Sequence, residues 1–252
     1  MSRHIDLNAD MGEGFGRWTI GNDDALLEVI TSANIACGLH AGDPDVMATT
    51  MARALERGVG LGAHPGFPDL QGFGRRRMSL PETSLRNMIR YQTGAAEAMA
   101  RGAGGLLRHF KLHGALSNMA SEDAALARIC YETALDVNPN LVILVLPQTA
   151  MEEVVLDLGC TWAGEVFADR AYNEDATLVD RALPGAMIQD PDDAAANMAG
   201  MVREQAIICA SGKRLPCRVD TICVHGDTPQ SIAIAKAVRA RLEADGHRVS
   251  PL

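Results

Sequence analysis

Short apolar stretches alternate with longer amphipathic stretches from one end of this 252-residue chain to the other. Alternation of this kind is typical of a parallel β-sheet whose strands are connected by covering helices. We expect strands over residues 4–9, 33–37, 59–63, 107–112, 141–146, 161–167 and 219–225, with a further candidate at 185–189. We expect helices over residues 23–31, 45–57, 82–101, 121–136, 148–158, 192–210 and 229–244, several beginning at a capping residue such as Asn22, Asp43 or Ser121.

Seven or eight such strand and helix units predict an α/β fold that closes, or nearly closes, into a barrel. A doubly wound open sheet is the alternative. The length of the chain and its hydrophobic content of 47% suffice for one sizeable core, so we expect a single domain over residues 1–252. Residues 65–81 form the longest stretch outside the expected elements, and a loop of that length is typical of a lid or a binding loop.

The expected strands end in polar residues that are followed by glycine. His40, His64, His113 and His225 each end a short apolar stretch, and each precedes a glycine within two residues. The first stretch instead ends in Asp10 and continues into a glycine-rich turn. Because the carboxyl ends of parallel strands meet on one rim of the fold, these polar groups should converge there. The pattern indicates an active site.

Composition excludes several classes of partner. The formal net charge of -9 disfavours a nucleic-acid partner, since the dense basic run is limited to Arg75-Arg76-Arg77. The six cysteines form no CxxC pair and lie in apolar segments, as reduced thiols do, so we expect a cytoplasmic protein. The strongest apolar run, residues 141–146, is far too short to span a membrane, and no membrane partner is expected.

Familiar nucleotide-binding and hydrolase motifs are absent from the sequence. The turn Gly12-Glu13-Gly14-Phe15-Gly16 follows a strand, but Arg17 stands where the dinucleotide fingerprint needs its third glycine. The sequence contains no GxxxxGK[ST], HExxH or GxSxG. If ATP takes part in the reaction, this chain lacks the usual phosphate cradle.

The first three strand ends carry five candidate residues. Asp10 lies beside glycines, where a buried carboxylate needs partners or a metal, so a functional role is favoured over that of a turn aspartate. For Glu13, a functional role and that of a solvated glutamate in a glycine turn are about equally favoured. His40 and Asp43 are close enough to share a proton, a metal or a substrate, although Asp43 also fits a helix cap. His64 is balanced between packing and function, and its place at a strand end favours function.

The later strands carry a lysine, two histidines and an arginine. Lys111 and His113 lie two residues apart, so in a strand they face the same side and could hold a developing oxyanion and a proton together. His225 and Asp227 repeat this arrangement at the last strand, where Asp227 also fits a helix cap. The guanidinium of Arg170 is suited to bind a carboxylate or a phosphate through two parallel hydrogen bonds, unless it pairs with the neighbouring Asp169.

Five segments of the chain resemble the signatures of the LamB/YcsF family. They are DLNADMGEG (6–14), ANIACGLHAGD (33–43), GAHPGFPD (62–69), EVFADRAY (165–172) and VHGD (224–227). The resemblance runs from the first strand to about the last. One segment departs from the family: Leu112 and Ser117 stand where the family usually has a proline and a tyrosine. A substrate contact made by that tyrosine would be missing here.

The resemblance implies an irregular seven-stranded TIM-like barrel, related to the fold of carbohydrate deacetylases. Characterised members of the family are the A subunits of bacterial 5-oxoprolinases. The implied reaction is the opening of the 5-oxoproline (pyroglutamate) lactam to L-glutamate, coupled to hydrolysis of ATP to ADP and phosphate. It implies two partner subunits, of the B and C types, and ATP with magnesium. Since this chain has no phosphate loop, the partners are expected to hold the nucleotide, with binding by glycine-rich loops and a lysine at the rim of this chain as the alternative.

The chemistry of lactam hydrolysis assigns roles to the candidate residues. We expect Asp10 or His40 to act as the base, and Lys111 and His113 to stabilise developing negative charge. Arg170 or an arginine of the 75–77 run would hold the substrate carboxylate. The expected substrate-binding set is Glu13, Asp43, His64, Arg75, Arg170, His225 and Asp227.

Two other classes of function are open to this sequence. One is a metal-dependent amide hydrolase or carbohydrate deacetylase acting alone, with Asp10, His40 and His113 as candidate ligands of a divalent metal and one coordination position left for water. The other is a non-catalytic carbohydrate-binding module. An aromatic content of 4% disfavours it, because sugar platforms use exposed aromatic rings.

Overall fold

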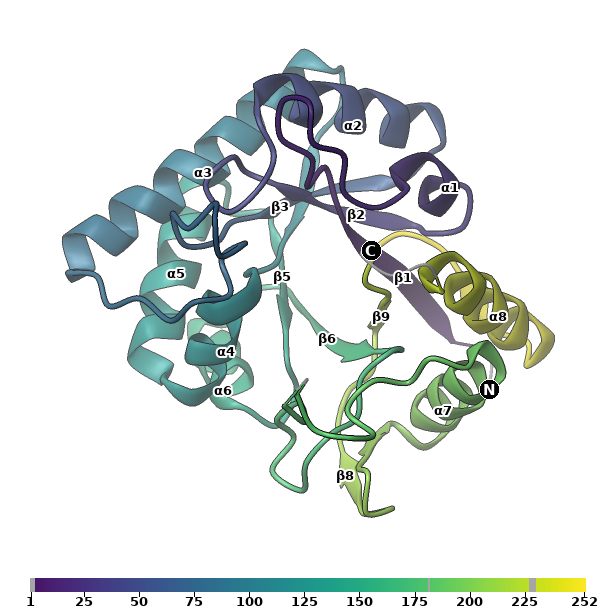
Figure 1. Ribbon diagram of the computed structural model, residues 1–252. Helices are drawn as coiled ribbons and strands as arrows, with labels where there is room; N and C mark the ends of the chain where they lie inside the picture. The colour runs from purple at the N-terminus through teal and green to yellow at the C-terminus, as the bar shows by residue number, and fades with distance from the viewer. Residues whose placement is uncertain (1–2, 181, 227–229) are drawn as a thin grey trace.

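The computed structural model describes residues 3–180, 182–226 and 230–252. Its centre is a barrel of parallel strands in the order β1-β2-β3-β4-β5-β6-β9, which the pairing of β9 with β1 closes (Figure 1). The strands of the barrel are β1 (His4–Met11), β2 (Ser32–Ala36), β3 (Gly60–His64), β4 (Leu107–Phe110), β5 (Val142–Val145), β6 (Trp162–Phe167) and β9 (Thr221–Cys223). The predicted seven-stranded barrel is confirmed, and the alternative of an open sheet is wrong.

Helices surround the barrel on its outer side (Figure 1). They are α1 (Asp23–Leu27), α2 (Pro44–Glu56), α3 (Glu82–Gly102), α4 (Gly114–Glu122), α5 (Ala124–Val137), α6 (Ala150–Leu158), α7 (Pro191–Glu204) and α8 (Ser231–Ala244). Apolar side chains of the helices and strands form one buried cluster between the two layers. None of the helices within the described ranges is both long enough and apolar enough to cross a membrane.

Two of the expected helices differ from those observed. The helix expected over 121–136 is divided into α4 and α5, and Asp123 rather than Ser121 caps α5, since its carboxylate accepts hydrogen bonds from Ala125 and Leu126. The helix expected over 192–210 ends at Glu204. Gln205 adopts a left-handed conformation with φ 49°, and the chain then forms the antiparallel hairpin of β7 (Ala206–Ile208) and β8 (Arg214–Pro216).

Smaller differences lie at other ends of elements. The candidate strand at 185–189 does not form, and Met187 makes an isolated bridge with Arg170 instead. Helix α1 covers five of the nine residues expected over 23–31. The short strand β10 (Arg248–Val249), which pairs with the start of β1, was not expected. The last expected helix began at 229, which lies outside the described residues, and α8 is described from Ser231.

The interior of the barrel contains a hydrogen-bonded polar network. Asp6, Asn8 and Asp10 alternate along β1 and are all buried, which places the three side chains on one face of the strand. Asp6 accepts hydrogen bonds from the hydroxyls of Ser32 (2.6 Å) and Thr221 (2.5 Å), and Asn8 donates to Thr221 at 2.7 Å. Because these buried groups are paired between β1 and its neighbouring strands β2 and β9, they hold β1 and its terminal Asp10 in a defined register.

A buried histidine fills the middle of the barrel. His109 Nε2 donates a hydrogen bond to Asn34 Oδ1 at 2.8 Å, and a Cβ atom on Gly62 would lie 2.0 Å from that nitrogen. Gly62 therefore leaves the space that the imidazole ring occupies. Burial, with the charge of Lys111 adding to it, lowers the pKa of His109 to about 3, so the ring is neutral at pH 7.

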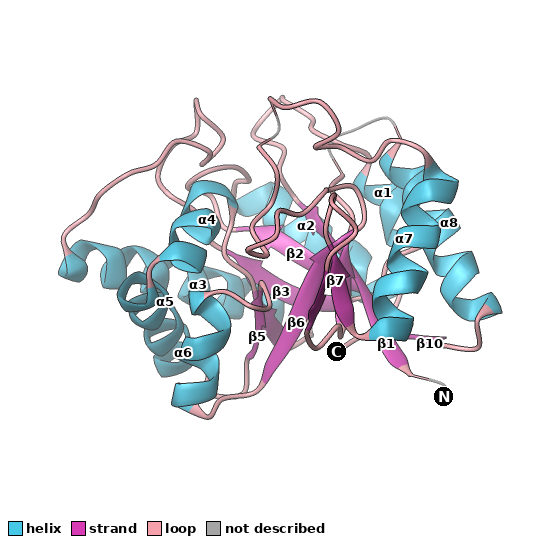
Figure 2. Cartoon of the chain, turned by 90° about the horizontal axis from the view of Figure 1, so that it is seen from below, coloured by secondary structure: helices cyan, strands magenta, loops and turns pink. Residues whose placement is uncertain are grey.

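Several connections at the carboxyl ends of the strands are long, and they lie at the end of the barrel opposite the N-terminus (Figure 2). The loop between β3 and α3, residues 65–81, is one of them, and the segment between β6 and α7, residues 168–190, is another. In barrels of this kind the catalytic residues lie in these loops and in the adjoining strand ends.

Candidate active site

Lys111 lies at the centre of this rim and is almost completely buried. Its Nζ is 2.9 Å from Asp10 Oδ1, 2.9 Å from Glu165 Oε1 and 3.0 Å from Cys223 Sγ. Burial alone would lower its pKa, but the neighbouring Asp10, Cys223 and Glu165 outweigh burial and hold the pKa of Lys111 well above its ordinary value. Lys111 is therefore a fixed cation between two carboxylates.

Asp10 is an ionised carboxylate at the end of β1. Its Oδ1 accepts hydrogen bonds from Lys111 and from Asn34 Nδ2, the latter at 2.9 Å, and its Oδ2 lies 3.3 Å from His64 Nε2. Burial works to raise its pKa, yet the charges of His64 and Lys111 together hold the pKa well below its ordinary value. Asp10 is therefore available to orient or accept a proton at the side of the barrel where His64 lies.

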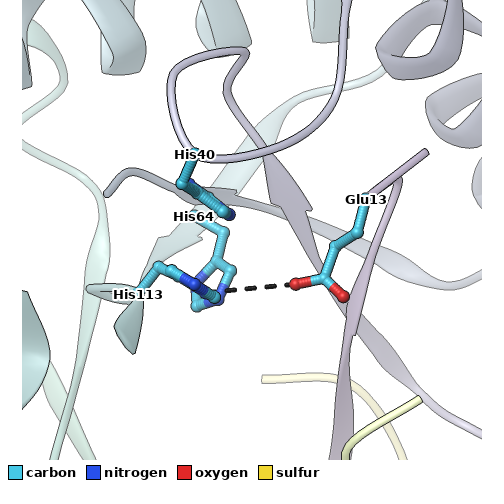
Figure 3. A group of neighbouring side chains, drawn as sticks. All are labelled: Glu13, His40, His64 and His113. Atoms are coloured by element: carbon cyan, nitrogen blue, oxygen red, sulfur yellow. Dashed lines mark hydrogen bonds and ion pairs between the residues drawn. The ribbon is translucent and has the colours of Figure 1, made fainter. Parts of the chain in front are cut away.

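Three histidines from three different strand ends form one cluster (Figure 3). The ring of His40 stacks on that of His113, with 3.7 Å between the centroids and 7° between the planes. The ring of His64 stands at 90° to that of His113. His64 Nδ1 donates to the backbone oxygen of Lys111 at 2.9 Å, and His113 Nε2 donates to that of Phe73 at 2.8 Å. The cluster is thus held by the backbone of two loops.

Glu13 completes this group from the β1 side. It is 6% exposed, and one of its oxygens lies 3.9 Å from His113 Nδ1 (dashed in Figure 3). Burial, with the neighbouring His64 adding to it, lowers the pKa of His113 to about 3. Burial, with His113 and His64 adding to it, holds the pKa of His40 well below its ordinary value. Both rings are therefore neutral at pH 7.

The loop after β3 approaches this cluster closely at a glycine. Gly74 has φ +62°, and a Cβ atom there would lie 2.7 Å from His40 Cβ and 2.9 Å from His113 Cδ2. Glycine tolerates this conformation and provides this clearance, whereas an L side chain meets both obstacles. The long loop at 65–81 is thereby packed directly against two of the predicted site residues.

A second pair of titratable groups lies across the rim. His225 Nδ1 is 2.9 Å from both carboxylate oxygens of Asp169, and its ring stacks on Phe167 with 5.2 Å between centroids. Because the carboxylate binds Nδ1, it fixes the orientation of the imidazole ring, as in the acid and histidine pairs of hydrolases. Asp227, the predicted neighbour of His225, lies outside the described residues.

Some of these residues line a cavity of about 820 Å³, a volume typical of ligand sites, whereas Glu13, His40 and His113 lie outside its lining. Asp10, His64, Lys111 and His225 line it, and Arg75, Arg77 and Arg170 bring further positive charge. Arg170 also donates a hydrogen bond to the backbone oxygen of Val179 at 2.6 Å, which holds its side chain across the segment that follows β6. The cavity combines cations for a carboxylate with groups that exchange protons.

Three members of the arginine run and of the predicted binding set have other partners. Arg76 pairs with Asp69, and Arg77 pairs with Glu122 at 2.6 Å. Asp43 caps α2, since its carboxylate accepts hydrogen bonds from Asp45 and Val46, and it also accepts one from Gly16 at 2.7 Å. The helix-cap interpretation of Asp43 is confirmed.

Two functional candidates were not identified from the sequence. Glu165 contacts Lys111, and Asp169 orients His225. A signal for Glu165 was present, because a glutamate within the apolar strand Trp162–Phe167 must find a buried partner. Asp169 was considered only as a partner of Arg170. The departures from the family pattern lie at the same rim, where Leu112 and Ser117 both line the cavity.

The site contains two sets of donor atoms suited to a metal ion. Glu13, His40, His64 and His113 form one, and Asp10, Cys223 and His225 form the other, with the donor atoms of each set within 4.8 Å of one another. The metal prediction named Asp10, His40 and His113. The structure thus groups His40 and His113 with two further donors, and places Asp10 among the contacts of Lys111.

The LamB/YcsF family model matches residues 5–252 of this chain. The chain belongs to the LamB/YcsF family. Among relatives, it is 64% identical to the A subunit of 5-oxoprolinase from Ruegeria pomeroyi, covering 98% of this chain and 97% of the relative. Among solved structures, it is similar to the lactam utilization protein of Thermus thermophilus, with a TM-score of 0.93 and 38% identity over 100% of both chains.

The fold of this LamB/YcsF member extends to more distant proteins. The catalytic domain of a peptidoglycan N-acetylglucosamine deacetylase from Eubacterium rectale superposes with a TM-score of 0.52 at 14% identity, covering 100% of this chain and 89% of the other. This likeness concerns the barrel alone. It confirms the predicted relation to the deacetylase fold.

Proposed function

We propose that this chain is the A subunit of an ATP-dependent 5-oxoprolinase, which opens the lactam of 5-oxoproline to L-glutamate and hydrolyses ATP to ADP and phosphate. The sequence identity of 64% to the A subunit of 5-oxoprolinase from Ruegeria pomeroyi, over 98% of this chain, carries this proposal. The cavity supports it, because a small anionic lactam needs a cation for its carboxylate and groups that move protons at its amide.

The role of ATP follows from the chemistry of an unstrained amide. Transfer of the γ-phosphoryl group to the lactam oxygen releases ADP and makes the ring carbon electrophilic. Water then adds to that carbon, and the C–N bond breaks as the nitrogen takes a proton. A second water releases phosphate from the resulting γ-glutamyl phosphate and leaves L-glutamate. Two partner subunits, of the B and C types, would complete this sequence and bind ATP with magnesium.

The residues of this chain divide the work of hydrolysis between two sides of the cavity. Arg170 or Arg75 binds the substrate carboxylate, since each brings a guanidinium to the lining. His225, oriented by Asp169, exchanges protons with water or with the leaving nitrogen. Lys111 stabilises the negative charge that develops on the oxygen of the reacting carbon, with its own position fixed by Asp10 and Glu165.

The test is glutamate release from 5-oxoproline in the presence of ATP and magnesium. The chain is assayed alone and then with B-type and C-type subunits that have been shown to work with the corresponding chain of another 5-oxoprolinase. The proposal expects release in the mixture and none from the chain alone. No release from the mixture, with the chain verified as folded, would contradict it.

The alternative is a metal-dependent amide or carbohydrate deacetylase that acts alone. The cluster of Glu13 with three histidines is the observation that favours it, because a site of that composition can activate water on a metal. Release of acetate from N-acetylated sugars by the metal-loaded chain without partners would support this alternative, and its absence would contradict it.

A further inference from the structure

Two ring nitrogens of the histidine cluster face each other, and backbone contacts fix the nitrogens on the far sides of the two rings. His64 Nδ1 and His113 Nε2 both contact backbone carbonyl oxygens, which accept hydrogen bonds and cannot donate them. Each ring therefore carries its hydrogen on the nitrogen directed at the backbone. The opposite nitrogens, His64 Nε2 and His113 Nδ1, lie 3.0 Å apart. The two facing nitrogens can share one proton or bind one cation, and Asp10 Oδ2 lies 3.3 Å from the same nitrogen of His64.

His40 adds a second unsatisfied ring to the same place. It is fully buried, and among the described parts of the chain nothing hydrogen-bonds to either of its ring nitrogens. A buried imidazole in that state loses the hydrogen bonds that it makes in water, which is unfavourable unless another partner replaces them. A single proton between His64 and His113 would satisfy both of those rings but would leave His40 unsatisfied.

We propose that Glu13, His40, His64 and His113 form a binding site for one divalent transition-metal ion. One ion would bind the facing nitrogens of His64 and His113, satisfy the ring of His40 and lie beside the buried carboxylate of Glu13. The proposal does not rest on the proposed 5-oxoprolinase activity.

The distances fit such an ion. Two nitrogens 3.0 Å apart can each lie about 2.1 Å from one ion, with an angle of about 90° at the ion. A tetrahedral ion places its ligand atoms about 3.4 Å apart, so the donor atoms of this set, now within 4.8 Å of one another, need movements of about an ångström. Side-chain rotation in Glu13 and His40 is sufficient for that.

The surroundings of the two fixed rings also match those of metal ligands. Histidine ligands characteristically donate their other ring N–H to a carboxylate or a backbone carbonyl, which sets the tautomer and directs the free nitrogen at the metal. His64 and His113 both do this. Three imidazoles and one carboxylate suit zinc, cobalt or iron, whereas magnesium and calcium prefer all-oxygen sites.

Isothermal titration calorimetry, with zinc titrated into the chelator-treated chain, measures the stoichiometry and the affinity of binding. We expect one zinc per chain, and an affinity at least about 100-fold weaker in His40→Gln and in Glu13→Gln. His225→Gln is the matched control, since it removes an imidazole from the other donor set of the rim and should keep the wild-type affinity. Circular dichroism verifies that each variant is folded.

Cobalt substitution of the wild-type chain gives a measurement that needs no variant. Cobalt bound by Glu13 and the three histidines shows d–d absorption without a thiolate-to-cobalt charge-transfer band. That band would place the ion on Cys223, in the other donor set, and would overturn the proposal. Absence of stoichiometric zinc binding, or unchanged affinity in His40→Gln, would overturn it as well.

Discussion

Lys111 Nζ lies 2.9 Å from Asp10 Oδ1 although 101 residues separate the two in the chain. Both side chains are buried, and the same ammonium contacts Glu165 at 2.9 Å. One cation thereby compensates two carboxylates at the centre of the barrel rim. The arrangement makes Lys111 important for folding as well as for the proposed chemistry, because its removal leaves two buried carboxylates without their shared cation.

Replacement of this lysine should destabilise the fold strongly. We expect Lys111→Met to lower the free energy of unfolding by about 3–5 kcal/mol, the range for a buried ion pair that loses one partner. Urea denaturation measures the loss. Lys213→Met is the control, because Lys213 is half-exposed and pairs with Glu174 at 3.6 Å, and its change should stay within about 0.5 kcal/mol. Equal losses in the two variants would contradict the central role of Lys111.

Replacement of Asp10 or of His113 should abolish most of the turnover. In the enzyme assembled with its partner subunits, we expect Asp10→Asn and His113→Ala each to lower glutamate release by about 100-fold or more. Asp10→Asn preserves the shape of the side chain and removes its charge beside Lys111 and His64. If both variants keep nearly full turnover, this rim is not the active site.

Asp169 should act as a positioning residue for His225, which exchanges protons with the substrate or with water. We expect Asp169→Asn to lower kcat by about 100-fold or more with a small change in KM, because the amide no longer fixes the imidazole orientation. The pH profile of kcat should change in the same variant. Asp192→Asn, in the first turn of α7, is the control and should keep both constants. A change confined to KM would indicate a binding role instead.

His109 should make stability depend on pH. Its folded pKa of about 3 lies below the ordinary value of 6.5, so the unfolded chain binds a proton in this range that the folded chain does not. Stability therefore falls as pH decreases from 6.5, by up to about 1.4 kcal/mol per pH unit. Urea denaturation between pH 7 and 5 should show a slope that is shallower in His109→Gln than in the wild type. Parallel profiles would contradict the assignment.

The close approach of the 65–81 loop should make Gly74 sensitive to substitution. Gly58→Ala introduces a positive-φ alanine with open space around its Cβ, which costs about 1–2 kcal/mol. Gly74→Ala causes a similar backbone strain and in addition a steric clash with His40 and His113. It should therefore lower the free energy of unfolding by clearly more than Gly58→Ala does. Thermal unfolding of both variants measures the difference. Equal shifts in melting temperature would show that the loop relaxes without disturbing the cluster.

The sequence alone was enough to predict the barrel and most of its rim. Apolar stretches that end in Asp10, His40, His64, His113 or His225 and a following glycine predicted parallel strands with functional groups at their carboxyl ends. This pattern is local, because strand formation and the turn after it depend on neighbouring residues. The division of the helix at 121–136 was missed, since Asp123 resembles any other surface aspartate until its side chain caps α5.

The tertiary structure decided which of these groups meet. Closure of β9 onto β1 and the register of the strands bring Lys111 between Asp10 and Glu165, and direct His64 Nε2 at His113 Nδ1. No spacing in the sequence contains this information, because the contacts cross the barrel between strands far apart in the chain. The local pattern therefore determines which residues reach the rim, and barrel closure determines their partners, their protonation and the chemistry that they can perform.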